Sequence, residues 1–267
     1  MKNRYIKQKT LKGHTGMALR KPLLLSVFAL FFLGAASVSA QEKTADEWQF
    51  DATIYLWGST INQTTGTGDK VLINFGTILK NLDFAGMATF GARKNKFSML
   101  TDVIYLDLSD SQRHKGEFLG YPVTGKLEIG LTSWVLNFVG GYNIFDNGKD
   151  IFDIMAGARY VDVKLDSTFK LNDLKRKNSA QGDVWDGVIG FKGRHNYPDG
   201  YYLNYYADVG GGGSSLTWQA AANFSYDYKK FTGIVGYRYL SWDFGKDTPA
   251  VDDMKIHGPY IGVKFKF

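Results

Sequence analysis

The sequence has no cysteine and only five prolines in 267 residues. Without cysteine the chain has neither disulfide bonds nor thiolate zinc sites. Acidic residues are absent from the first 40 positions, and histidine occurs only three times after them. No spacing of histidine and carboxylate residues predicts a metal site, and we expect no cofactor.

The first 40 residues differ from the rest of the chain. An apolar run at 23–36 follows a basic region and ends in Ser37-Val-Ser-Ala40. The run is shorter than the ~18–20 residues that cross a bilayer as a helix, and small residues follow it at cleavage spacing. We predict a secretory signal peptide over 1–40 and an exported domain over 41–267. A retained anchor is the alternative, and Met17 is an alternative start because the basic region before it is long.

The excess of basic over acidic residues in the chain comes from this segment. The whole sequence has 32 basic and 26 acidic residues, with a formal net charge of +6 and a pI near 9.2. Seven of the basic residues lie in the first 40 positions, so 25 remain against 26 acidic ones. The exported domain is therefore close to neutral, and we expect no nucleic-acid partner.

Apolar and polar residues alternate with period two through most of residues 41–267, which is typical of β-strands. The clearest case is 215–228, where residues such as Trp218 and Phe224 alternate with residues such as Gln219 and Asn223. We predict ten strands, at 48–57, 81–94, 96–108, 125–142, 150–164, 183–195, 200–210, 215–228, 231–243 and 255–267. Eight or twelve strands are alternatives, because both faces of 96–108 and 125–142 carry apolar residues.

The connections between these strands alternate in length. Short ones lie at 93–96, 146–149, 196–199 and 229–230, and longer ones at 58–80, 109–124, 166–182 and 244–254. The glycine run 210–213 is the exception, a tight hairpin where a long loop is due. Within the first long connection we expect a hairpin extension at 69–74 and then one helical turn. This pattern predicts an antiparallel up-and-down barrel with its termini and short turns at one end.

Aromatic residues gather near both ends of the predicted strands. One set lies near the short turns: Trp48, Tyr142, Phe145, Phe152, Tyr201, Phe231, Phe265 and Phe267. The other lies near the long connections: Trp57, Tyr160, Trp185, Trp218, Tyr239 and Trp242. At ~3.3 Å per residue and a tilt near 40°, Trp48 and Trp57 stand roughly 23 Å apart, close to the apolar band of a transmembrane barrel. We predict an all-β transmembrane barrel of the Gram-negative outer membrane, with periplasmic termini; a soluble lipocalin-like barrel is the alternative.

The last strand carries Val263, Phe265 and Phe267 at alternate positions and ends on an aromatic residue. This pattern resembles the terminal assembly signal of outer-membrane barrels. Further segments, among them Asp183-Val-Trp-Asp-Gly-Val-Ile-Gly190 and Gly258-Pro-Tyr-Ile-Gly262, resemble a widespread family of proteobacterial outer-membrane barrels, small porin-type barrels of the OmpA and OmpW kind. The resemblance implies location and fold but no activity. It also implies outer-membrane lipids, the barrel-assembly machinery and periplasmic chaperones as partners.

Charged residues occur on the face of the strands that we expect to point inward. They are Asp83, Asp102, Arg159, Asp186, Asp208 and Arg238. Their positions along the strands predict that they form one layer inside the barrel, below the end that carries the long connections. Such a layer can act as a selectivity constriction, or its charges can pair and fill the narrow lumen of a barrel of about ten strands.

Three functions follow as hypotheses. The first is a structural or narrow porin-like barrel with a charged, largely filled lumen. The second is a surface ligand-binding or adhesion barrel that uses 58–80, 109–124 and 166–182. The third is a hydrolase at the extracellular rim, resembling the omptin proteases, with His114 or His257 beside loop carboxylates. No spacing singles out a catalytic dyad, and we expect no enzymatic activity.

Overall fold

The computed structural model describes residues 46–65, 70–118, 121–172, 174–229, 231–245 and 251–267, all within the compact unit Lys43–Phe267. The predicted signal peptide, its cleavage after Ala40 and the alternative start at Met17 lie outside these residues. Among the described residues, no helix has the length and apolar character needed to cross a membrane.

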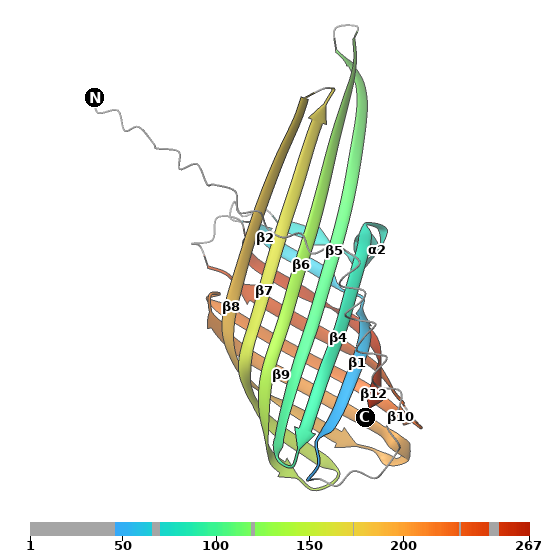
Figure 1. The fold of residues 1–267 in the computed structure, drawn as a ribbon, viewed down its shortest axis with the longest axis vertical. Helices are drawn as coiled ribbons and strands as arrows, with labels where there is room; N and C mark the ends of the chain where they lie inside the picture. The colour runs from blue at the N-terminus through green and yellow to red at the C-terminus, as the bar shows by residue number, and fades with distance from the viewer. Residues whose placement is uncertain (1–45, 66–69, 119–120, 173, 230, 246–250) are drawn as a thin grey trace, which may run out of the picture. The chain divides into compact units, whose positions relative to one another are not determined.

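Ten antiparallel strands close into a barrel (Figure 1). They are β1 (Gln49–Trp57), β4 (Leu82–Lys94), β5 (Phe97–Phe118), β6 (Tyr121–Asp146), β7 (Asp150–Leu171), β8 (Leu174–Asn196), β9 (Tyr201–Gly212), β10 (Leu216–Tyr228), β11 (Phe231–Asp243) and β12 (Val251–Lys266). Each pairs with the next in this order, and β12 pairs with β1. Closure removes free sheet edges from the barrel wall. The predicted all-β barrel of about ten strands is confirmed.

The short connections gather at one end of the barrel, called here the turn end. All four contain residues in the left-handed backbone region, Asn95, Gly148, Asp199 and Lys229, which tight turns between antiparallel strands require. At the opposite end, β9 and β10 are joined through residues 213–215, as predicted from the glycine run. These turns fix the register, so the face on which each side chain lies is set along the whole ladder.

The first long connection folds over the end opposite the turns. It contains β2 (Thr60–Thr65) and β3 (Lys70–Ile73), a hairpin that pairs with β12, and the short helix α2 (Phe75–Lys80). Asn74 caps this helix by accepting a hydrogen bond from the Thr77 backbone N–H at 2.9 Å. Ile78 is buried, so α2 covers the interior. The predicted hairpin and helical turn are present, although the hairpin begins earlier, at Thr60.

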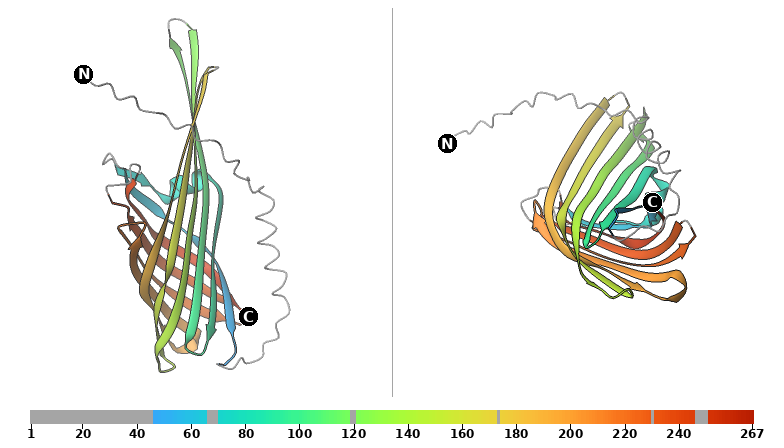
Figure 2. Two further views of the ribbon diagram at one scale, coloured as in Figure 1. Left: turned by 60° about the vertical axis from the view of Figure 1, so that its left-hand side comes forward. Right: turned by 60° about the horizontal axis from the view of Figure 1, so that its bottom comes forward.

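Four strands are longer than predicted. β5 to β8 contain 22, 26, 22 and 23 residues, and 109–124 and 166–182, expected to be loops, are mainly strand. Residues 109–118, 121–130, 166–172 and 174–185 form a sheet, called here the extension, that projects beyond the other strands (Figures 1 and 2). The loop prediction was wrong because these segments alternate weakly, whereas their pairing is continuous across β5, β6, β7 and β8.

The barrel wall is apolar outside. Exposed side chains on its outer face include Phe50, Ile54, Leu56, Phe138, Ile154, Ile189, Phe224, Val235 and Ile261. The aromatic set near the turn end is mostly on this face. In the opposite set, Trp185 and Trp218 are exposed: Trp185 packs on Tyr160 with tilted rings and Trp218 stacks on Tyr239, with ring centroids 4.7 Å apart in both pairs.

Two residues of that set are placed wrongly by the sequence prediction. Trp57 is 5% exposed and Trp242 is fully buried, so both point into the barrel. The physical reason is strand phase, since Trp57 shares its face with the buried Thr53 and Tyr55. The separation of about 23 Å from Trp48 to Trp57 therefore joins residues on opposite faces and does not measure the outer band.

Candidate functional site

Five charged residues meet across the lumen in what we call the charge layer: Asp102, Arg159, Asp186, Asp208 and Arg238. Each of them is at most 6% exposed. Strand register brings part of the layer together, because Asp102 pairs with Asn137, Asn137 with Arg159, and Arg159 with Asp186 on consecutive strands β5 to β8. Asp208 on β9 and Arg238 on β11 complete it from the other side.

Arg159 forms the first ion pair of the layer. Its Nη2 donates to both carboxylate oxygens of Asp208, at 2.8 and 2.6 Å. Its Nε donates to Asn137 Oδ1 at 2.7 Å and its Nη1 to Thr217 Oγ1 at 2.7 Å. All three nitrogens of the planar guanidinium thus donate hydrogen bonds, which offsets the free-energy cost of burying its charge.

Arg238 forms the second ion pair. Its Nη1 lies 2.7 Å from Asp102 Oδ2, and its Nε and Nη2 donate to Gln219 Oε1 at 3.0 and 2.6 Å. The Tyr55 hydroxyl donates to Asp102 Oδ1 at 2.7 Å and accepts from Arg238 Nη1 at 3.1 Å. Asn137 connects the two pairs, because it also donates to Asp102 Oδ2 at 3.5 Å.

The other two predicted members differ from these. Asp186 is buried and accepts a hydrogen bond from the Ser214 backbone N–H at 2.8 Å, but its Oδ2 has no hydrogen-bond partner among the described residues. Asp83 is exposed and lies at a bulge between Leu82 and Phe84. Its predicted place in the layer is therefore corrected, because the bulge breaks the two-residue phase on which the prediction rested.

The sequence prediction missed several neutral members of the layer. Tyr55, Asn137 and Thr217 supply its hydrogen bonds, and Trp57 and Trp242 lie over the guanidinium groups of Arg238 and Arg159 at 5.1 and 6.0 Å. The alternation of residues along β1 and β10 was sufficient to place Tyr55 and Thr217 on the inward face, because each shares that face with other inward residues. Asn137 was hidden because 125–142 carries apolar residues on both faces.

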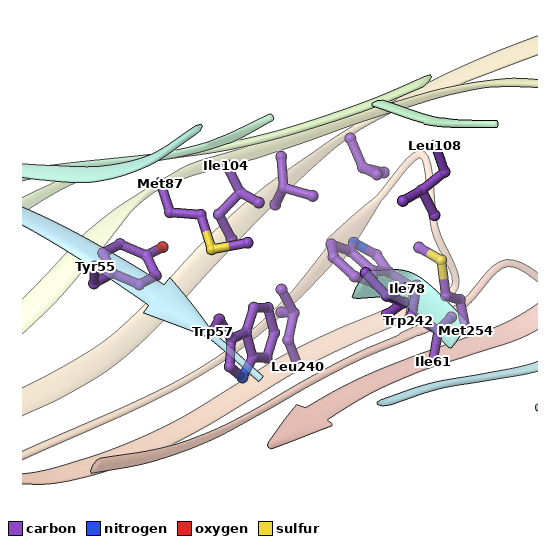
Figure 3. Close-up of a cluster of buried hydrophobic side chains, with 12 residues drawn as sticks. Tyr55, Trp57, Ile61, Ile78, Met87, Ile104, Leu108, Leu240, Trp242 and Met254 are labelled. Carbon is purple, nitrogen blue, oxygen red and sulfur yellow. The ribbon is translucent and has the colours of Figure 1, made fainter. Parts of the chain in front are cut away.

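Beyond the charge layer, away from the turn end, the interior is filled by apolar side chains. This cluster contains Tyr55, Trp57, Ile61, Ile78, Met87, Ile104, Leu108, Val135, Val161, Leu240, Trp242 and Met254. Figure 3 shows its labelled members pointing towards one another from β1, β2, α2, β4, β5, β11 and β12. Paired charges and an apolar core therefore lie in series along the lumen.

The histidines form no catalytic arrangement among the described side chains. His257 Nε2 lies 3.0 Å from Asn62 Nδ2 and its Nδ1 lies 2.9 Å from the Tyr237 hydroxyl, so its partners are neutral. His195 lies at the turn end, where its Nδ1 is 2.5 Å from Asp150 Oδ1, and this hydrogen bond lowers the pKa of Asp150. The side chain of His114 is outside the described part. Among the described residues no three His, Asp or Glu side chains group as a metal site.

The terminal strand closes the barrel. Val263 and Phe265 face outward, and Phe265 pairs in register with Ala52 of β1 and Phe231 of β11. The Phe267 backbone N–H donates to the Phe50 carbonyl at 2.9 Å. Recognition of these residues as an assembly signal stays a prediction.

Comparison with family models gave no match, and comparison with curated proteins gave none either. Solved structures with a similar fold include the translocator domain of autotransporter NalP from Neisseria meningitidis, with 17% identity, a TM-score of 0.45, and coverage of 92% of this chain and 97% of that one. The outer membrane protease OmpT from Escherichia coli has 11% identity, a TM-score of 0.43 and coverage of 86% and 100%. Ail, the attachment invasion locus protein of Yersinia pestis, has 12% identity, a TM-score of 0.35 and coverage of 83% and 99%. These matches carry no argument about function, and the OmpA and OmpW resemblance stays a prediction.

Proposed function

We propose that this chain is an integral outer-membrane β-barrel with a sealed lumen and a structural role. The observation that carries the proposal is the reversed polarity of the barrel, whose outer face is apolar while charged side chains point into the lumen. Ile189, Phe224 and Ile261, on three different strands, are 57–66% exposed. An apolar surface that surrounds a closed sheet is costly in water but favourable in lipid.

The aromatic pairs on the outer face support a band of membrane thickness. Trp218 stacks on Tyr239 near one end of β10, and Tyr226 packs on Tyr201 near the other, with centroids 4.7 and 4.6 Å apart. Tyr226 lies eight positions after Trp218 along the strand. At ~3.3 Å per residue and a tilt near 40° they stand roughly 20 Å apart, close to the apolar band of outer-membrane barrels. We place the turn end in the periplasm, because short turns face that side in such barrels.

Closure of the lumen favours a structural role over a narrow pore. The charge layer uses both arginines in ion pairs, and the apolar cluster blocks the path beyond it. A permeating ion would have to replace buried ion pairs, which costs several kcal/mol. As partners we propose outer-membrane lipids and, during biogenesis, the barrel-assembly machinery and periplasmic chaperones. The neutral partners of His257 support the expectation that the chain is not an enzyme.

The location is tested by fractionation and electrophoresis. The protein should be recovered with the outer membrane, and unboiled samples should migrate at a different apparent size from boiled ones because a closed barrel resists detergent. Recovery in the soluble periplasm, with one apparent size under both conditions, would contradict the proposal.

Surface binding is the second candidate, and the extension favours it. Its two faces differ: Leu127, Ile129 and Phe169, together with Leu165 just below the extension, are exposed on the side that continues the barrel interior. The opposite side carries charges, with Glu128 Oε1 at 2.5 Å from Lys126 Nζ and 3.1 Å from Lys170 Nζ. Exposed apolar side chains on a projecting sheet are a common feature of binding surfaces. Loss of binding upon removal of the extension would distinguish this function from the structural one.

A further inference from the structure

The half of the lumen between the charge layer and the turn end is rich in basic side chains. Five of them lie on the inward face of their strands: Arg93, Lys192, Arg194, Lys264 and Lys266. Register establishes this, since Lys192 pairs with the buried Asp153, and Lys264 with the buried Thr53 and Thr232. The carboxylates on the same inward face are Asp51, Asp153 and Asp227, so basic groups are in excess.

Two of the carboxylates already have basic partners. Arg93 forms an ion pair with Asp153, and Lys266 Nζ lies 2.7 Å from Asp227 Oδ2. For the remaining Lys192, Arg194 and Lys264, no carboxylate oxygen lies within 4.0 Å among the residues that the structure describes. Three cations without an ion pair therefore share this space with Asp51.

Arg194 has an unused donor. Its guanidinium lies over the Tyr202 ring, 3.5 Å from the ring centroid. Its Nε is buried and has no hydrogen-bond partner among the described residues. Stacking holds the guanidinium plane in one orientation, so its donors are fixed and directed rather than free to follow solvent.

Lys192 and Lys264 lie on the inward faces of two strands, β8 and β12, that are not neighbours in the barrel. Repulsion between two cations is stronger between the low-dielectric walls of a barrel than in bulk water. The same walls concentrate the electric field of a cleft whose charges have one sign, and this field attracts a counter-ion. An anion between the two strands would relieve the repulsion.

We propose that the turn-end half of the lumen is a binding vestibule for a small multivalent oxyanion, with Lys192, Arg194 and Lys264 as its ligands. Ammonium and guanidinium groups suit phosphate and carboxylate oxygens. Because the charge layer closes the vestibule above, the anion binds and does not pass through. The assignment rests on the proposed function in one respect only: the anion enters from the periplasm, where we place the turn end.

Isothermal titration of the refolded barrel in detergent tests this, with pyrophosphate and citrate as separate probes. We expect saturable binding of at least one, weakened about tenfold or more in the Lys192→Gln, Lys264→Gln variant because two of the three positive charges without an ion pair are lost. The control variant Lys164→Gln, Lys170→Gln removes the same charge from the part of β7 far from the turn end and should bind as the parent does. Stronger binding of pyrophosphate would identify the phosphate class, and stronger binding of citrate the carboxylate class.

An Asp51→Asn variant provides a test in the opposite direction. Loss of this carboxylate leaves the cations unopposed, so pyrophosphate and citrate should bind more tightly than to the parent. No saturable binding of either probe, or equal weakening in the two double variants, would overturn the proposal. Every protein is first checked for the size shift upon boiling, so that failure of the barrel itself is distinguished from an empty vestibule.

Discussion

At the scale of single residues, we expect the ion pair of Arg159 and Asp208 to tolerate substitution least. Both side chains are almost completely buried, at 0% and 1% exposed, and the guanidinium contacts the carboxylate through two hydrogen bonds. Removing one partner leaves an uncompensated charge, whereas replacing both removes the cost of burial.

We therefore expect Arg159→Met to lower the free energy of unfolding by about 3–5 kcal/mol. The double variant Arg159→Met, Asp208→Leu should regain most of that loss. Guanidinium unfolding of the refolded barrel in detergent measures both. Equal losses in the single and double variants would show that the Asp208 charge is not the source of the cost.

Asp186→Asn is the matched control in the same layer. The amide oxygen can still accept from the Ser214 backbone N–H, and the substitution removes a charge whose Oδ2 has no described partner. Its effect should stay within about 1 kcal/mol of the parent, in contrast to Arg159→Met.

Glu128 in the extension provides a pH prediction. Hydrogen bonds from Lys126 and Lys170 lower the pKa of this carboxyl from 4.5 to about 2. Since the folded pKa lies below the unfolded value, the pairs stabilise the extension above pH 4.5, and this contribution is lost as the pH falls towards 2. Carboxyl-carbon NMR should give a midpoint near 2 that rises in about 1 M salt, because the pairs are partly exposed and screened. A midpoint of 4.5 at low salt would refute the pairing.

At the scale of elements, the extension should be separable from the barrel. Asp110 pairs with Ile129, and Asp166 with Ser179, just beyond the barrel wall. Deletion of 111–128 and 167–178, each replaced by an Asn-Gly turn, keeps every strand pairing of the wall. The variant should still shift in apparent size upon boiling, while any surface binding of the parent is lost. Loss of the size shift would show that the extension is needed for folding.

Strand alternation predicts the ten elements and most of their inward faces, because lipid and lumen require opposite polarities on successive residues. It fails where one of these requirements is missing. In the extension neither face meets lipid, so the periodicity of 109–124 and 166–182 fades although the strands continue. Trp57 and Trp242 were placed by residue type, whereas the strand phase of Trp57 places it inside. Which side chains of the charge layer contact one another depends on how the barrel closes. No local sequence pattern contains that information.

At the scale of the whole molecule, the lumen has three parts. A basic vestibule lies at the turn end, the charge layer follows, and the apolar cluster covered by α2 closes the far end (Figure 3). Because the last two parts are buried, we propose that the barrel is a sealed support for the extension rather than a channel.

Conductance of the parent protein in a planar bilayer tests this most directly. Insertion is first verified in liposomes of the same lipid, where the unboiled protein must show the size shift and the wall must resist protease. We expect no current above that of the bare bilayer. Discrete ion-selective steps from the parent protein would contradict it, and their change in Arg159→Ala or Arg238→Ala would show that the charge layer is a constriction.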